Sequence, residues 1–249
     1  MFKNLPVVTR NLIIINIALF LLTTILSSAG IIELDVLLGS YYPESVNFKF
    51  WQPFTHMFIH AGISHLLFNM FALFMFGATI EHLIGTKRFL ILYFVAGMGS
   101  FLLFNVQSYF MIEPLKDAVF NLGLAPEQIN ALIKLDNFGN ATVPAFFNTV
   151  TEVSALVQAY ITPMVGASGA IYGILIAFGM FYPNAELMFF FIPKPVKAKY
   201  FIPGIILVEI VLGLLNLSWN PIAHFAHLGG AAAGFLLILY WRKSGQISR

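Results

Sequence analysis

The chain of 249 residues contains no cysteine and few charged side chains. Without cysteine it has no disulfide, no thiolate zinc site and no cysteine nucleophile, and the redox state of its compartment stays open. Only 10% of the residues are charged, and the net charge is +2. Soluble domains carry about 25% charged residues, so these charges cannot cover a water-soluble globule of this size. The small net charge also gives no footprint for a nucleic-acid partner.

Apolar sequence is what the chain has in excess, because 59% of its residues are hydrophobic. A helix that spans a bilayer needs about 20 mostly apolar residues. We therefore expect an all-α polytopic membrane protein in which residues 1–249 form one membrane domain. The six predicted spans lie near Leu12–Leu26, His65–Leu83, Phe89–Phe104, Ser168–Phe181, Tyr200–Leu217 and Ile222–Trp241. The fourth is short, and its ends are expected to reach into the neighbouring loops.

The basic residues orient these spans. Ten of the 13 Lys and Arg residues fall in the two terminal segments, the turn after the second span and the loop after the fourth. Basic residues are enriched on the cytoplasmic side, so we expect a multi-pass protein of a plasma or inner membrane with both termini cytoplasmic. A secretory signal peptide is the alternative for the first span, because Lys3 and Arg10 precede an apolar stretch that ends at Ser27-Ser28-Ala29.

The segment 107–165 falls on the opposite, extracytoplasmic side and contains no run apolar enough to cross the bilayer. Pro126 and the apolar residues after it predict a short helix with one apolar stripe, formed by Ile129, Leu132 and Ile133. A second amphipathic helix is predicted by a stripe of residues at spacings of three and four, which are Phe146, Val150, Val153, Val157 and Tyr160. We expect a helical insertion between the third and fourth spans, lying on the outer membrane surface.

Ser168 and His227 are the residues best suited to nucleophilic chemistry. Ser168 opens the fourth span, and His227 lies about five residues into the sixth, where an ionisable group is costly and is a functional candidate. Small residues beside them, Gly169 and Gly230 among them, allow two helices to approach closely. Such packing would bring a histidine base to a serine hydroxyl. The alternatives are glycines that serve packing alone and a neutral, hydrogen-bonded His227.

His65 and Asn69 are four residues apart at the start of the second span and share one helix face. Imidazole and amide donors aimed at one point can form an oxyanion hole, although an asparagine here is more often a contact between helices. Glu209 lies near the middle of the fifth span. We expect it to be protonated and hydrogen-bonded; as a proton relay it would suit a transporter. No carboxylate is expected to complete a triad with Ser168 and His227.

The histidines also raise the possibility of a metal site. One group consists of His56, His60 and His65, and a second consists of His224 and His227. The chain has no His-Glu-x-x-His motif and only one His-x-x-x-His. We therefore expect no metal ion, and no motif indicates another cofactor.

Together, these motifs resemble those of the rhomboid family of intramembrane serine proteases. Gly166-Ala167-Ser168-Gly169 is similar to the family's Gly-x-Ser-Gly, and Tyr172 stands four residues after the serine, as the family's tyrosine does. The stretch from His65 to Asn69 resembles the His-x-x-x-Asn of the second helix. Ala226-His227, with Gly230 and Gly234, resembles the Ala-His-x-x-Gly-x-x-x-Gly of the sixth. The resemblance covers roughly residues 10–106 and 166–241.

The resemblance implies a six-helix bundle with a water-filled cavity that opens outward, and an endopeptidase that cleaves membrane proteins with a transmembrane segment. Ser168 would be the nucleophile and His227 the general base and acid. The oxyanion would be held by His65, Asn69 and the backbone N–H of Ser168, with Gly166 keeping the approach open. Tyr172 would pack on the His227 ring.

One family feature is missing from the first loop, where the usual Trp-Arg is Trp51-Gln52. The role of that arginine is therefore unfilled. Two other functions remain open. One is a protease-dead relative that binds membrane clients, although such relatives typically lack the serine or histidine that this chain keeps. The other is a transporter that works through Glu209.

Overall fold

The computed structural model describes residues 5–140, 147, 149–189, 192–215, 217, 220 and 222–247. Lys3, Phe146 and Arg249, which entered the orientation and stripe predictions, lie outside the described residues. Each predicted span corresponds to a helix among the described residues. The helices are α1 (Val7–Ser28), α4 (Ile63–Ala72) continued through a π-helical turn (Leu73–Gly77) into α5 (Ala78–Ile84), α6 (Thr86–Asn121), α9 (Ser168–Phe181), α10 (Ala198–Leu215) and α11 (His224–Lys243).

The chain is an integral membrane protein by the length and composition of these helices. In the described ranges, five stretches are long and apolar enough to cross a bilayer: α1, α4–α5, α6, α10 and α11. The fourth predicted span, α9, has 14 residues, as its short apolar run indicated. It packs between α6 and α11, so that most of its length is buried by protein.

Glycines allow α6, α9 and α11 to pack with their backbones close together. A Cβ at Gly173 of α9 would overlap Ala96 of α6 and would lie 3.0 Å from the Gly230 carbonyl oxygen of α11. A Cβ at Gly234 would lie 2.6 Å from the Gly173 Cα. The predicted close approach of small-faced helices is therefore confirmed, and it joins the helix that begins with Ser168 to the helix that carries His227.

A buried glutamate ties the start of α1 to the bundle. The two carboxylate oxygens of Glu81 accept hydrogen bonds from the backbone N–H groups of Val8 at 2.9 Å and Thr9 at 2.7 Å. These N–H groups have no partner inside the helix because they belong to its first turn. Glu81 therefore stabilises a helix terminus, twelve residues after Asn69 in the chain.

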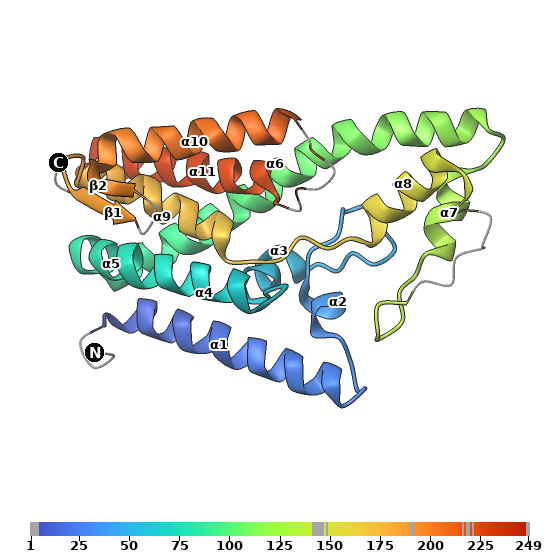
Figure 1. The fold of residues 1–249 in the computed structure, drawn as a ribbon, viewed down its shortest axis with the longest axis horizontal. Coiled ribbons are helices and arrows are strands. Elements are labelled where there is room, and N and C mark those ends of the chain that lie inside the picture. Colours follow the sequence, from blue (N-terminus) through green and yellow to red (C-terminus); the bar gives the residue numbers. More distant parts are fainter. Residues whose placement is uncertain are drawn as a thin grey trace.

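A β-hairpin interrupts the predicted all-α architecture between α9 and α10. Strands β1 (Glu186–Phe189) and β2 (Ile192–Lys197) pair antiparallel, with Glu186 opposite Lys197. Pro193 and Pro195 conceal the second strand in the sequence, because proline cannot donate to a strand ladder. The hairpin lies at the same end of the molecule as the start of α1 and the end of α11 (Figure 1).

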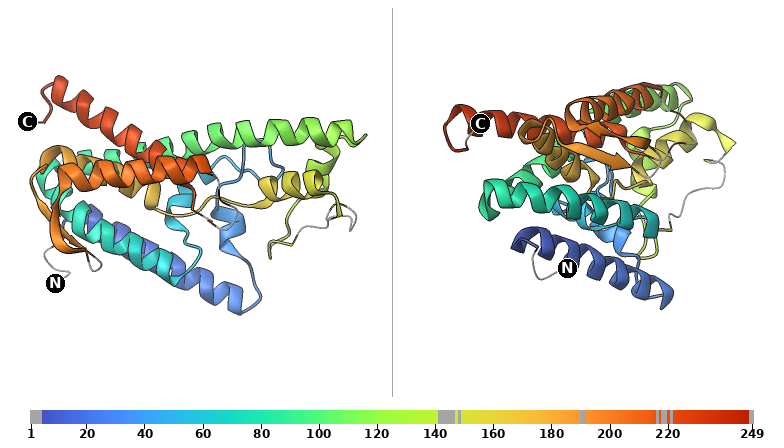
Figure 2. Two further views of the ribbon diagram at one scale, coloured as in Figure 1. Left: turned by 45° about the horizontal axis from the view of Figure 1, so that its top comes forward. Right: turned by 60° about the vertical axis from the view of Figure 1, so that its left-hand side comes forward.

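The insertion is built differently from the prediction. Helix α6 does not end near Phe104 but continues to Asn121, about 54 Å in total at 1.5 Å per residue. Helices α7 (Pro126–Leu132) and α8 (Thr151–Ile161) lie beside its C-terminal part, at the end of the molecule opposite the hairpin (Figures 1 and 2). Their buried side chains form one cluster with α6 and the first loop, which includes Ile112, Val119, Ile129, Ile133, Val153, Leu156, Val157 and Tyr160.

Both amphipathic helices predicted in this segment exist, but their apolar stripes pack on protein. Val153 and Val157 of the second stripe are buried against α6 and α7, whereas Leu132 of the first stripe is exposed. A stripe needs an apolar partner surface, and the extended α6 supplies it. These stripes therefore pack against protein, and the position of the insertion on the outer membrane surface stays a prediction.

The first loop contains two short helices, α2 (Leu34–Leu38) and α3 (Gln52–Thr55). Gln52 is fully buried, and its Oε1 accepts a hydrogen bond from the backbone N–H of Lys49 at 2.9 Å. Its Nε2 donates to the carbonyl oxygens of Asn47 at 3.2 Å and Leu37 at 3.4 Å. A buried amide that bonds several backbone groups holds a loop together, so Gln52 has a structural role at the position of the missing arginine.

Candidate active site

Ser168 is the first residue of α9, and backbone hydrogen bonds hold the segment before it in place. The backbone of Met164 pairs with Ser40 in an isolated antiparallel bridge, and the Gly166 N–H donates to the His56 carbonyl oxygen at 2.9 Å. Gly166 has a φ of 120°, which side-chain-bearing residues rarely adopt. The backbone before Ser168 therefore requires glycine at position 166, and its hydrogen bonds orient the start of α9.

His227 lies in the first turn of α11, directly beside Ser168. Its Nε2 is 2.8 Å from the Ser168 Oγ, within hydrogen-bond range. The Tyr172 ring, one turn along α9 from Ser168, stacks on the imidazole with centroids 4.4 Å apart and an interplanar angle of 7°. A flat, close stack restricts rotation of the histidine ring, so the imidazole edge stays directed at the serine.

Gly169 and Gly230 set the separation of the two helices at this point. A Cβ at Gly230 would overlap the Gly169 carbonyl group, so no larger residue fits without moving α9 from α11. Gly169 directly follows Ser168, and Gly230 is three residues after His227. The Ser168–His227 hydrogen bond therefore depends on this glycine contact.

We predict that Gly230→Ala lowers the rate of any reaction that the Ser168–His227 pair catalyses by about 10²-fold, the typical cost of a 1 Å misplacement of reacting groups. Overpacking should also destabilise the bundle by about 1–3 kcal/mol. Gly204→Ala is the matched control, because a Cβ at Gly204 in α10 meets nothing within 4 Å. The rate of reaction at Ser168 and thermal melting in detergent measure both effects. Equal behaviour of the two variants would contradict the dependence on close packing.

Glu209 of α10 lies on the far side of the His227 ring, which corrects the expectation that no carboxylate reaches this histidine. Its Oε1 is 3.0 Å from the His227 Nδ1, and its Oε2 is 2.5 Å from the His224 Nδ1. The Tyr172 hydroxyl also bonds to Oε1. The predicted hydrogen bonding of Glu209 is confirmed, and three polar side chains share its carboxyl group.

His65 of α4 lies against the approach to Ser168. A Cβ at Gly166 would come within 2.8 Å of the His65 Nε2 and within 3.7 Å of the Ser168 Oγ. His65 is half-buried, so its ring borders the space in front of the serine. Asn69 lies one turn later, is 6% exposed, and donates from Nδ2 to the His65 carbonyl oxygen at 2.8 Å.

His56 and His60 of the first loop are buried and uncharged. The His60 and His65 rings meet edge to face, with centroids 5.1 Å apart. Burial lowers the pKa of His56 to about 3, and burial together with the nearby His65 lowers the pKa of His60 to about 4. Both are therefore neutral at physiological pH and add no positive charge beside Ser168.

A different set of side chains has the spacing of metal ligands. Glu209, His224 and His227 each offer one ligand atom, and these atoms lie within 4.8 Å of one another. Sequence reasoning missed this grouping because Glu209 lies on α10, whereas both histidines lie on α11. The position of Glu209 deep in an apolar span marked it as a functional candidate. That position did not show which side chains would be its partners.

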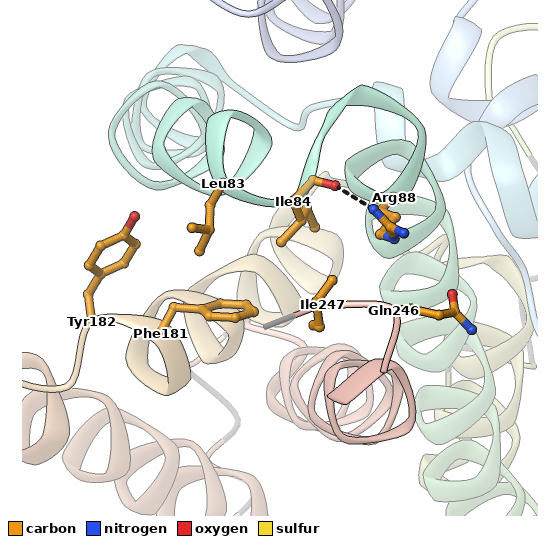
Figure 3. Close-up of a pocket in the computed structure, with 7 residues that line it drawn as sticks. All are labelled: Leu83, Ile84, Arg88, Phe181, Tyr182, Gln246 and Ile247. Carbon is orange, nitrogen blue, oxygen red and sulfur yellow. Dashed lines mark hydrogen bonds between the residues drawn. The ribbon is translucent and has the colours of Figure 1, made fainter. Parts of the chain in front are cut away.

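The pocket in Figure 3 lies far from these residues. It has a volume of about 290 Å³ and is lined by Leu83, Ile84, Arg88, Phe181, Tyr182, Gln246 and Ile247. Phe181 ends α9, thirteen residues from Ser168 or about 20 Å along the helix. The pocket is therefore at the end of the bundle near the termini, and it is not the outward cavity that the resemblance implies.

Comparisons with known proteins give consistent matches. A family model described as a rhomboid domain matches residues 47–118 and 137–244. An uncharacterized mitochondrial rhomboid protein of Schizosaccharomyces pombe is 29% identical over 211 residues, which are 78% of this chain and 52% of that protein. The rhomboid protease AarA of Providencia stuartii is 27% identical over 246 residues, 92% of this chain and 70% of that protein. Mitochondrial rhomboid protein 1 of Saccharomyces cerevisiae is 22% identical over 236 residues, 90% of this chain and 66% of that protein. The chain thus spans about half the length of the first relative and about two thirds of the others.

Proposed function

We propose that this chain, which belongs to the rhomboid family, is an intramembrane serine endopeptidase that uses Ser168 and His227. The observation that carries the proposal is the 2.8 Å contact between the Ser168 Oγ and the His227 Nε2. The contact supplies the adjacent base that a serine hydroxyl needs in order to act as a nucleophile. A relative matched over most of this chain is named a rhomboid protease.

In the proposed reaction, the Ser168 Oγ attacks the carbonyl carbon of the scissile peptide bond, and its proton moves to the His227 Nε2. The same proton then passes to the leaving nitrogen, so that the peptide bond breaks and an acyl-enzyme forms. Water repeats the cycle, giving its proton to His227 while its oxygen bonds to the acyl carbon. Ser168 is released with its proton restored.

The negative charge that develops on the substrate oxygen needs donors beside Ser168. The His65 ring borders this position across Gly166, and the Ser168 N–H belongs to the open first turn of α9. We assign these two groups and Asn69 to the oxyanion site. Gly166 contributes by having no side chain, since a Cβ there would displace the His65 ring.

Substrates would be membrane proteins with a transmembrane or membrane-adjacent segment, met within the lipid bilayer. We place six spans, with α9 as the short one enclosed by its neighbours. The test is cleavage of a single-pass membrane protein by purified wild type and by Ser168→Ala. Cleavage by the wild type alone supports the proposal, and equal cleavage by both proteins contradicts it.

Two other functions compete with this proposal. A rhomboid-like protein without activity would bind membrane clients and leave the test substrate intact. A transporter would use Glu209 as a proton relay, but its carboxyl group bonds to both His224 and His227. Proton-coupled flux that is lost in Glu209→Gln would support the transporter.

We further place both termini in the cytoplasm and the insertion 107–165 outside, in a plasma or inner membrane. The C-terminal end of α6, which carries Asp117, and strand β2, which carries Lys194, lie at opposite ends of the molecule (Figure 1), and both residues are exposed. Because the chain has no cysteine, single cysteines at these positions are unambiguous probes. We predict that a membrane-impermeant reagent labels Asp117→Cys from outside intact cells and Lys194→Cys only after permeabilisation. Labelling of both from one side would contradict the orientation.

A further inference from the structure

We infer that Glu209 is a positioning residue for His227, held in place by His224 and Asn220. The inference rests on the proposed function, because it concerns the base of the same reaction. A chain of hydrogen bonds runs from Asn220 through His224 and Glu209 to the His227 Nδ1. This chain determines which nitrogen of the His227 ring carries the proton. Only the ring with its proton on Nδ1 leaves Nε2 free to accept the proton of Ser168.

The chain of hydrogen bonds begins at Asn220, whose orientation is set by the backbone. The Asn220 Oδ1 accepts from the Ile222 N–H at 3.1 Å, so its amide nitrogen faces the other way. That nitrogen is 2.7 Å from the His224 Nε2. An amide nitrogen can only donate, and the His224 Nε2 must therefore be the acceptor. The single proton of a neutral His224 is then on Nδ1.

This proton position determines the state of Glu209. The His224 Nδ1–H donates to the Glu209 Oε2, and the Tyr172 hydroxyl is in place to donate to Oε1. Glu209 is only 7% exposed, and a buried charge is tolerated when enough donors surround it. With these donors the carboxylate needs no proton of its own. It is therefore ionised, in place of the protonated glutamate that its position in the sequence suggested.

An ionised Glu209 leaves one arrangement for His227. Its Nδ1, 3.0 Å from the Glu209 Oε1, must be the donor, because a carboxylate only accepts. The opposite nitrogen, Nε2, then presents its lone pair to the Ser168 hydroxyl. When Nε2 takes up the serine proton, the adjacent carboxylate stabilises the imidazolium. In serine proteases of other folds, changing such an orienting carboxylate to an amide lowers kcat about 10⁴-fold.

Glu209, His224 and His227 could instead hold a metal ion. A metal ion and a chain of hydrogen bonds would have different effects on catalysis. Zinc on the His227 Nδ1 would leave the ring proton on Nε2, where it blocks acceptance of the serine proton. A metal at this position would therefore inhibit cleavage. Positioning by hydrogen bonds predicts full activity after treatment with a chelator.

The kinetic experiment compares Glu209→Gln with Glu81→Gln in the full-length protein. A glutamine at 209 can donate to the His227 Nδ1, which favours the ring with its proton on Nε2. We expect kcat to fall about 10²–10⁴-fold with little change in KM, the signature of a group that acts in the transition state. Glu81→Gln is the matched control, since it alters a buried carboxylate that only caps α1. It should leave kcat unchanged.

A spectroscopic measurement separates positioning from a merely structural role. The ¹⁵N chemical shifts of His227, assigned by comparison with His227→Gln, report which ring nitrogen carries the proton. We expect an unprotonated Nε2 in the wild type and a protonated Nε2 in Glu209→Gln. If that variant does not fold, the wild-type spectrum still decides.

Three results would overturn the inference: wild-type kcat in Glu209→Gln, a wild-type His227 with its proton on Nε2, or cleavage that a chelator changes. Failure of the proposed function is distinguishable from these outcomes. In that case wild type and Ser168→Ala would give the same result with the test substrate. The ¹⁵N shifts would still show whether Glu209 sets the proton position of His227.

Discussion

Ser168→Ala and His227→Ala are each expected to reduce cleavage to background, and the double variant is expected to be no worse than either single one. The serine hydroxyl is a weak nucleophile until a base takes its proton, and the base has no task without the serine. Groups that act as one unit are strongly non-additive. Rates of cleavage of a single-pass substrate by the purified variants measure this directly.

Two exposed positions provide matched controls for the dyad. Ser244→Ala and His82→Ala change the same residue types at exposed sites, Ser244 directly after the end of α11 and His82 in α5. Both should cleave at the wild-type rate. A serine-reactive phosphonate should label the wild type and these controls but not Ser168→Ala. Substantial cleavage by either Ser168→Ala or His227→Ala would refute the assignment of the dyad.

His65→Ala and Asn69→Ala are each expected to lower kcat about 10²–10³-fold, the usual cost of one oxyanion donor, with a much smaller change in KM. The charge on the substrate oxygen develops only in the transition state, so the missing donor is not felt during binding. Steady-state kinetics on a peptide containing one cleavage site separates the two parameters.

Asn105→Ala is the control for Asn69, because the Asn105 Nδ2 donates to the Phe101 carbonyl oxygen at 2.7 Å, four residues back as in Asn69. It removes the same local hydrogen bond at a site on α6. If both asparagine variants lose the same activity, Asn69 acts in helix packing. If activity instead follows added zinc and disappears with a chelator, the histidines bind a metal.

Several features followed from local sequence because their physical cause is local. An apolar run must be helical in a bilayer, where every backbone N–H and C=O group needs a partner within its own segment. The fourth span therefore matched α9 from Ser168 to Phe181. The stripe of Val153, Val157 and Tyr160 likewise predicted the buried face of α8.

Errors arose where a partner lies far away in sequence. The spacing of residues after Phe104 could not show that α6 continues, because its continuation depends on packing against α7 and α8. The hairpin after α9 depends on pairing between two short strands, one of which contains two prolines. Gln52 could not be recognised as a loop anchor, since its partners are backbone groups that only the folded loop brings together.

The residues of the candidate site also differ in whether their role depends on local sequence or on contacts between distant segments. Sequence was sufficient to single out Ser168, His227, His65 and Asn69, because residue chemistry and helix spacing are local properties. Tertiary structure alone decided that α10 sets Glu209 against the His227 Nδ1 and the His224 Nδ1. Eighteen residues and a change of helix separate Glu209 from His227, and no periodicity relates two antiparallel helices across a loop. Their relative rotation is set by packing, so the carboxylate behind the histidine became visible only in the fold.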